Sequence, residues 1–80
     1  MSAHTPRPIA ERLEIAILTS EQMRLHWIDE KDQTHYMTVV LPLAVEEAKD
    51  ADYLRCRVLE DDVEILVRID LIQNLPTPTK

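Results

Sequence analysis

The side chains best suited to metal binding or nucleophilic chemistry are few and widely spaced in this chain. They are three histidines and one cysteine, at His4, His26, His35 and Cys56. A structural zinc site needs about four such ligands at short, characteristic spacings, and the chain has neither a C-x-x-C nor an H-x-x-x-H motif. His26 and His35 could face each other across a hairpin, because only a short polar segment separates the runs that carry them. Ordinary surface histidines are the simpler interpretation, and we expect no metal and no cofactor.

Motifs for catalysis are also missing. Cys56 lies inside an apolar run with no base marked beside it, which is typical of a small buried side chain rather than a nucleophile. The acidic pairs Glu46-Glu47 and Asp61-Asp62 fall in expected loops, where solvated charge is the ordinary explanation. A phosphate-binding loop needs glycine, and the chain contains none. We therefore expect a protein that is not an enzyme.

Basic residues offer one candidate binding surface. Arg24, Arg55 and Arg57, together with Arg68, could line one face of a sheet. With Tyr36 or Tyr53 available for stacking, such a face would resemble that of a nucleic-acid-binding barrel. The opposing interpretation is that these arginines pair with the many surrounding acids, and the net charge favours it.

Acidic residues offer the other candidate surface. Glu11 and Glu14 lie one turn apart on the exposed face of an expected helix, and Glu21 follows them. Asp29 and Glu30 begin the expected loop of the first hairpin. A surface of this kind is usually only solvated, but it is also where an acidic protein would meet a basic groove.

The spacing of apolar residues predicts one helix followed by four strands. Ile9, Leu13, Ala16 and Ile17 share one face of a helix that we expect to begin after Pro8 and to end near residues 19 and 20. Apolar residues beyond this helix alternate with the period of strands. The expected strands span 22–29, 34–41, 53–59 and 63–69.

The connections between these strands are polar. Residues 29–32 and 60–62 are expected hairpin loops, and because the chain lacks glycine we expect loops of about three to five residues rather than two-residue turns. Pro42 should end the second strand or kink it at a sheet edge, and Val45 to Asp52 should form a helical turn or an acidic loop. The apolar residues Leu71, Ile72 and Leu75 should make a brief fifth strand or a closing turn.

These elements predict the α+β class, with an N-terminal helix packed on a small, strongly bent antiparallel sheet of four to five strands, or on a partly open barrel. Bends without glycine make full closure of the barrel harder. A single domain over 9–75 is expected between flexible tails at 1–8 and 76–80. Eighty residues allow one compact core and disfavour a large substrate cleft.

The net charge is −6, from fifteen acidic and nine basic residues. That balance repels nucleic acid at long range and favours a basic protein partner. No run approaches the roughly 20 apolar residues that span a membrane, and the start lacks the apolar core of a signal peptide. We expect a cytoplasmic protein, with its oligomeric state open.

Two stretches resemble the Rho-binding antiterminator (Rof-like) family of small bacterial proteins. The first is R-L-E-I-A-I at 12–17 followed by M-R-L-H-W-I-D at 23–29, and the second runs from D-Y-L-R-C-R-V-L-E-D-D at 52–62 into V-E-I-L-V-R-I-D-L-I at 63–72. The resemblance implies an Sm-like fold with an N-terminal helix. It also implies inhibition of transcription termination by binding the Rho hexamer where RNA would enter, with Glu11 and Glu14 at the contact.

A second resemblance leads to a different function. T-V-V-L-P-L-A-V at 38–45, with Y-L at 53–54 and R-I-D-L-I at 68–72, is similar to the WYL domain of bacterial transcription regulators. That domain is also Sm-like, and it implies ligand or nucleic-acid binding through a basic pocket, here Arg24, Arg55 and Arg57. A phage or mobile-element inhibitor of a host nucleic-acid machine is a third possibility. The net charge favours the first function, in which Glu11, Glu14, Asp29 and Glu30 occlude a basic RNA-binding surface.

Overall fold

The helix forms where the apolar stripe predicts it. The computed structural model describes residues 7–74 and 76–78, and its helix α1 spans Arg7–Thr19. Leu13 and Ala16 are fully buried against the sheet, while Ile9 and Ile17 are partly buried beside them. The helix ends at Thr19 because the N–H groups of the next two residues bond back to it: that of Ser20 donates to the Ile17 carbonyl and that of Glu21 to the Ala16 carbonyl. This pair of bonds is a Schellman C-cap.

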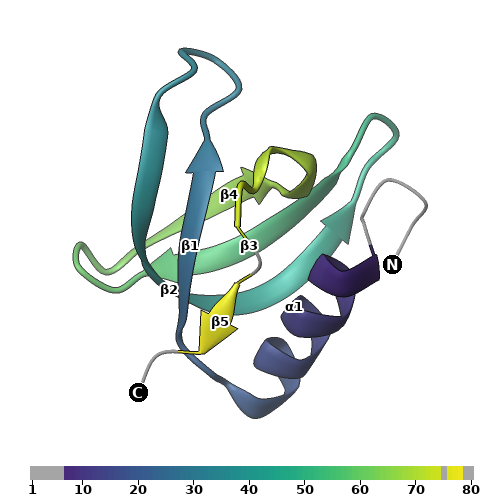
Figure 1. Cartoon of the computed structure of the whole chain (residues 1–80), viewed down its shortest axis with the longest axis vertical. Helices are drawn as coiled ribbons and strands as arrows, with labels where there is room; N and C mark the ends of the chain where they lie inside the picture. The colour runs from purple at the N-terminus through teal and green to yellow at the C-terminus, as the bar shows by residue number, and fades with distance from the viewer. Residues whose placement is uncertain (1–6, 75, 79–80) are drawn as a thin grey trace.

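The rest of the chain forms a bent antiparallel sheet with the helix packed on it, which confirms the α+β class (Figure 1). The strands lie in the order β4-β3-β2-β1-β5 and all pairs are antiparallel. A short 3-10 helix, η1, follows β4. The bounds are β1 Met23–Ile28, β2 His35–Glu47, β3 Asp52–Val58, β4 Val63–Arg68, η1 Ile69–Leu71 and β5 Thr77–Pro78.

Apolar side chains at alternate positions of β1 and β3 supply most of the core. Their buried faces meet those of the helix and of β4 in a single cluster, because successive residues of a strand point to opposite sides of the sheet. From β1 to β4 the buried residues of this cluster are Met23, Leu25, Trp27, Val40, Leu54, Cys56 and Val67, and Ile69 and Ile72 close it.

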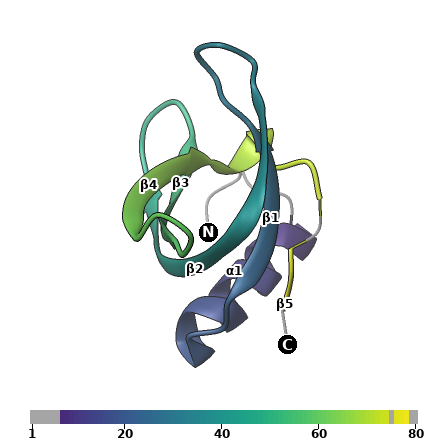
Figure 2. The ribbon, with the colours of Figure 1, turned by 90° about the vertical axis from the view of Figure 1, so that its left-hand side faces the viewer.

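The course of β2 corrects two predictions. The strand does not end at Pro42, the first alternative, but is irregular there, as the second alternative expected, although β2 is an inner strand and not a sheet edge. It continues to Glu47, so Val45 to Asp52 is neither a helical turn nor an acidic loop. Only residues 48–51 connect β2 to β3. The register shifts between Pro42 and Ala44, which leaves Leu43 without a partner in a β-bulge. The bulge accommodates a proline that cannot donate to the ladder, and it bends the strand around the core (Figure 2).

Polar residues take the left-handed backbone conformation that glycine usually supplies. Positive φ angles occur at Ser20 (55°), Gln33 (61°) and Asp62 (55°). They lie at the end of the helix, in the loop 29–34 and in the loop 59–62. Loops longer than two residues replace the turns that favour glycine, as expected, although the loop 29–34 is longer than the expected three to five residues.

Both ends of the described chain are part of the fold. The helix already begins at Arg7, and Pro76 is buried, although residues 76–80 are expected to be a tail. Thr77 and Pro78 pair with Arg24 and Met23 of β1. Residues 1–6 and 79–80 of the expected tails, and Leu75 of the expected closing segment, lie outside the described residues.

Candidate binding cleft between the hairpin tips

A cleft of about 530 Å³ lies between the tips of the two hairpins. One side belongs to β1 and β2 and the other to β3 and β4. Figure 1 shows the flanking loops, 29–34 at the top and 59–62 at the left. We call this site the hairpin cleft; its apolar walls are formed mainly by Trp27, Tyr36, Met37, Val58, Ile65 and Leu66. Its volume is typical of a ligand site.

Two aromatic rings form the β1–β2 side of the hairpin cleft. Trp27 and Tyr36 are direct partners in the register of the two strands. Their ring centroids are 5.5 Å apart and the rings are stacked at 21°. Trp27 is buried, whereas Tyr36 is 42% exposed, so the pair presents an aromatic surface to the cleft that is backed by a buried ring.

The cleft gathers exposed apolar side chains. Met37 is 65% exposed and Leu66 52%, and both line the cleft with Tyr36. The other large apolar side chains that are exposed in the described chain, namely Ile15, Leu18 and Val63, do not line it. Apolar surface concentrated in a concavity marks an interaction site more often than scattered apolar residues do.

The rim of the hairpin cleft is acidic. Asp29, Glu60 and Asp61 line it, and none of its lining residues is basic. The Asp29 carboxylate accepts hydrogen bonds from the backbone N–H groups of Lys31 (2.8 Å) and Asp32 (3.4 Å), so its position is fixed by the turn. Glu60 and Asp61 are exposed, and no side-chain hydrogen bond or ion pair joins them to another described residue.

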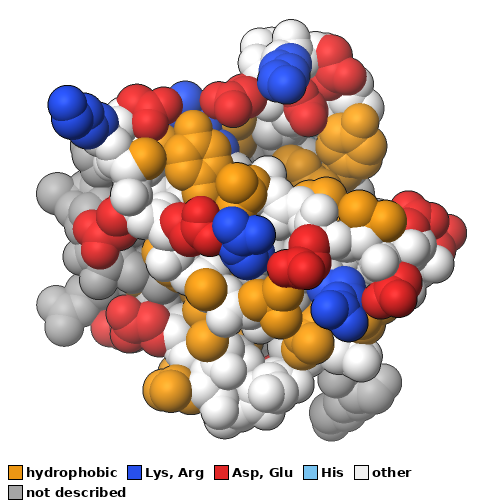
Figure 3. Space-filling model, turned by 180° about the vertical axis from the view of Figure 1, so that it is seen from behind, with side chains coloured by type: hydrophobic (Ala, Val, Ile, Leu, Met, Phe, Trp, Pro, Cys, Tyr) orange, Lys and Arg blue, Asp and Glu red, His pale blue; other side chains and the backbone are white. Residues whose placement is uncertain are grey.

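The arginines of the outer sheet face are neutralised by neighbouring acids. Arg55 Nε lies 2.5 Å from Glu46 Oε2, and Arg57 Nη1 lies 3.6 Å from Asp62 Oδ1. Figure 3 shows the blue side chains of this side lying among red ones. The hydrogen bond to Glu46 raises the pKa of Arg55 above its ordinary value.

Arg24 differs from those two arginines. It is exposed on β1, which β2 separates from β3, and no ion pair joins it to another described residue. The three arginines therefore do not converge on a pocket.

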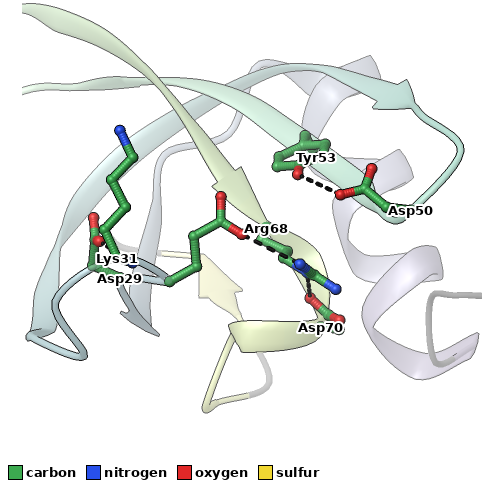
Figure 4. A network of polar contacts seen from close by, with 7 residues as sticks. Asp29, Lys31, Asp50, Tyr53, Arg68 and Asp70 are labelled. Atoms are coloured by element: carbon green, nitrogen blue, oxygen red, sulfur yellow. Dashed lines mark hydrogen bonds and ion pairs between the residues drawn. The ribbon is translucent and has the colours of Figure 1, made fainter.

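Arg68 joins the first hairpin loop to the segment after β4 (Figure 4). Its guanidinium donates from Nη1 to Glu30 Oε2 (3.2 Å) and from Nε to Asp70 Oδ1 (2.7 Å). These bonds raise the pKa of Arg68, the one to Asp70 most strongly. Nearby, the Tyr53 hydroxyl donates to Asp50 Oδ2 (3.3 Å). Glu30, although exposed, is thus paired with Arg68.

The acids predicted to bind a partner fall at two ends of the molecule. Glu11 and Glu14 are exposed on α1, whereas Asp29 and Glu30 lie in the β1–β2 loop. Figures 1 and 2 both place the helix and this loop at opposite ends. One compact contact cannot include all four, and Asp29 is the member that lines the hairpin cleft.

His26, His35 and Cys56 do not line the cleft, and His4 lies outside the described residues. His26 Nε2 and His35 Nδ1 are 3.2 Å apart, which confirms that the two rings face each other across the hairpin. Within residues 7–74 and 76–78, no three potential ligands are grouped to hold a metal ion. Cys56 is fully buried, as expected, and burial raises the pKa of its thiol to about 12. Neither helix in the described part of the chain, α1 or η1, has the length and apolar character to cross a membrane.

Comparison with protein-family models, curated proteins and solved structures gives no match for this chain. The candidate site therefore rests on geometry. Of its apolar wall residues, the sequence singles out only Tyr36, as a stacking residue beside the arginines. A signal for two others exists, because Met37 and Leu66 occupy positions where the alternation of β2 and β4 calls for polar side chains.

Proposed function

We propose that this protein is a non-catalytic acidic binding protein that occludes a basic RNA-binding surface of a partner protein. The partner suggested by the sequence resemblance is the Rho termination factor, and the effect would be antitermination. An Sm-like fold and a cytoplasmic location belong to the same proposal. The helix followed by a bent antiparallel sheet supports the fold assignment.

One observation carries the choice of a basic protein over nucleic acid: the outer-face arginines are held in ion pairs. Glu46 and Asp62 offset the charges of Arg55 and Arg57, and Glu30 and Asp70 offset that of Arg68. A phosphate backbone would have to displace these carboxylates from a chain whose net charge is −6. The uncompensated charge of the surface is negative, which suits a positively charged groove.

Occlusion requires only that carboxylates sit where phosphates would bind. Glu11 and Glu14 are exposed on a rigid helix at one end of the molecule, and Asp29 is fixed by its turn at the other. Charge pairs at the rim of an interface act mainly on the association rate and are screened by salt. The complex should therefore weaken as ionic strength rises.

A pull-down from bacterial lysate tests the proposal. The tagged protein, after nuclease treatment, should retain Rho or another RNA-binding protein near 0.1 M salt and lose most of it near 0.5 M, where screening is much stronger. Retention of nucleic acid alone, lost after nuclease treatment, would contradict the proposal and favour the WYL-like alternative.

Charge-reversal variants test whether the acidic surface of α1 contacts the partner. Glu11→Lys with Glu14→Lys should lower retention at least about tenfold if the helix makes the contact. Glu47→Lys with Glu64→Lys changes the charge equally at exposed positions of β2 and β4 and is the control. Equal losses in both double variants would mean that only net charge matters, and would reject the helix surface.

A further inference from the structure

We propose that the hairpin cleft binds an arginine side chain, presented next to an apolar residue by a basic segment of a partner protein. This inference rests on the proposed function in one respect, the basic character of the partner. It adds the place of contact and the chemistry of recognition.

The first step is the match between the cleft and an extended peptide segment. A volume of about 530 Å³ accommodates a few side chains but no folded element. The cleft is open between two hairpin loops, so a chain can lie across it. Met37 and Leu66 offer exposed apolar surface to a hydrophobic neighbour of the arginine.

The second step is charge complementarity. Asp29, Glu60 and Asp61 line the rim, and no lysine, arginine or histidine lines the cleft to offset them. A purely apolar or an anionic occupant would remove water from Glu60 and Asp61, whose carboxylates have no partner among the described residues, and this is unfavourable. A cation supplies that partner. The same carboxylates repel a phosphate backbone, which disfavours RNA even though the aromatic rings could stack on a base.

The third step selects arginine over lysine. A guanidinium is planar, is weakly hydrated and stacks on aromatic rings, and its fork of N–H donors matches carboxylate oxygens. The cleft presents both features, because the stacked Trp27–Tyr36 pair lies on the β1–β2 side and Glu60 and Asp61 lie on the opposite loop. A lysine ammonium would use the charge but not the planar stacking.

The test uses the full chain and three synthetic peptides, Ac-Ala-Leu-Arg-Leu-Ala-NH2 and its lysine and citrulline analogues. Citrulline keeps the planar group and removes the charge. Trp27 is the only tryptophan in the chain, so its fluorescence reports on the cleft directly, and amide NMR shifts map the contact. We expect saturable binding of the arginine peptide, binding at least about threefold weaker for the lysine peptide, and at least about tenfold weaker for the citrulline peptide.

Two pairs of variants separate the charge from the apolar surface. Glu60→Gln with Asp61→Asn should weaken arginine-peptide binding about tenfold, whereas Glu47→Gln with Glu64→Gln removes the same charge elsewhere and should have little effect. Leu66→Ser should also weaken binding, and Leu18→Ser, at a more exposed apolar position, is its control. All these positions are exposed or near the surface, and a circular dichroism spectrum confirms that each variant is folded.

Three outcomes would overturn the inference: equal binding of the arginine and citrulline peptides, shifts located away from the cleft, or equal effects of the cleft variants and their controls. Different results would reject the proposed function and the cleft inference. If the cleft binds the arginine peptide but the lysate yields no basic RNA-binding protein, the cleft inference stands and the proposed function falls. If the cleft variants retain the lysate partner as the wild type does, the cleft inference falls and the proposed function stands.

Discussion

Among the described residues, three polar side chains lie at turns with positive φ angles, where glycine is the usual choice. Side-chain sterics make the left-handed conformation unfavourable by about 1–2 kcal/mol for most residues. Ser20, Gln33 and Asp62 all adopt it, at φ of 55°, 61° and 55°. Backbone bonds fix the first two: Ser20 lies in the Schellman cap, and Gln33 N–H donates to the Asp29 carbonyl at 2.9 Å. The strain is therefore imposed by the elements that these turns connect.

Replacement of Ser20 by glycine should stabilise the fold. Ser20→Gly removes the steric cost at the C-cap, and part of this gain is offset by the greater entropy of the unfolded chain, leaving a net gain of about 0.5–1 kcal/mol. Urea unfolding, followed by Trp27 fluorescence, measures it. Thr19→Gly, one residue earlier and within the helix, should destabilise instead. A loss of stability in both variants would contradict the strain argument.

Burial of Cys56 makes folding stability depend on pH in the alkaline range. The folded-state pKa is raised to about 12, whereas a thiol in the unfolded chain ionises near its ordinary value of about 8.5. The folded state thus keeps a proton that the unfolded state loses. The contribution to stability is complete below the ordinary pKa and is lost as pH rises toward 12.

Urea unfolding at several pH values between about 7 and 10.5 checks this dependence. The free energy of unfolding should fall more steeply with pH for the wild type than for Cys56→Ala, which lacks the thiol. Parallel curves for the two proteins would contradict the prediction. The buried thiol should also react slowly with a disulfide reagent until the protein unfolds.

At the scale of elements, the helix is held by one narrow face. Leu13 is fully buried against the sheet, whereas Leu18 on the same helix is 84% exposed. Leu13→Ala should cost about 2–5 kcal/mol, a large part of the 5–15 kcal/mol typical of a domain. Leu18→Ala makes the same change in side chain and helix propensity but should cost less than about 0.5 kcal/mol. Denaturant melts of both variants check the prediction, and similar losses would mean that the helix packs differently.

The strands show how far periodicity alone can predict an element. Alternation located β1, β3 and β4 to within one or two residues, because each has one buried face. It failed for β2 beyond Pro42, where the bulge at Leu43 breaks the two-residue period. Nothing local to Val45 to Glu47 favours a strand, and pairing with β3 decides their conformation.

At the scale of the whole molecule, the C-terminal segment forms hydrogen bonds with both the helix and the sheet. The Pro76 carbonyl accepts a hydrogen bond from Arg12 Nε (3.1 Å), and Gln73 N–H donates to the His26 carbonyl (2.7 Å). An isolated bridge also joins Trp27 to Ile72. Residues far apart in sequence thus meet at the edge of β1.

Truncation after Asn74 should therefore lower stability. The variant loses buried Pro76, the β5 pairing and the bond to Arg12, for an expected cost of about 1–3 kcal/mol. Arg12→Met removes only that bond and should cost about 1 kcal/mol or less. Thermal unfolding of the three proteins measures both effects. An unchanged midpoint in the truncated protein would show that the segment after Asn74 adds no stability.

The sequence by itself determined the helix, most strand positions and the core faces, because these depend on spacing along a short stretch of chain. Only the tertiary structure decided the continuation of β2, the pairing of residues 77–78 with β1 and the hairpin cleft. It also separated Glu11 and Glu14 from Asp29 and Glu30, and paired Glu30 with Arg68. Each of these outcomes depends on contacts between residues distant in sequence, which the bend and register of the sheet bring together.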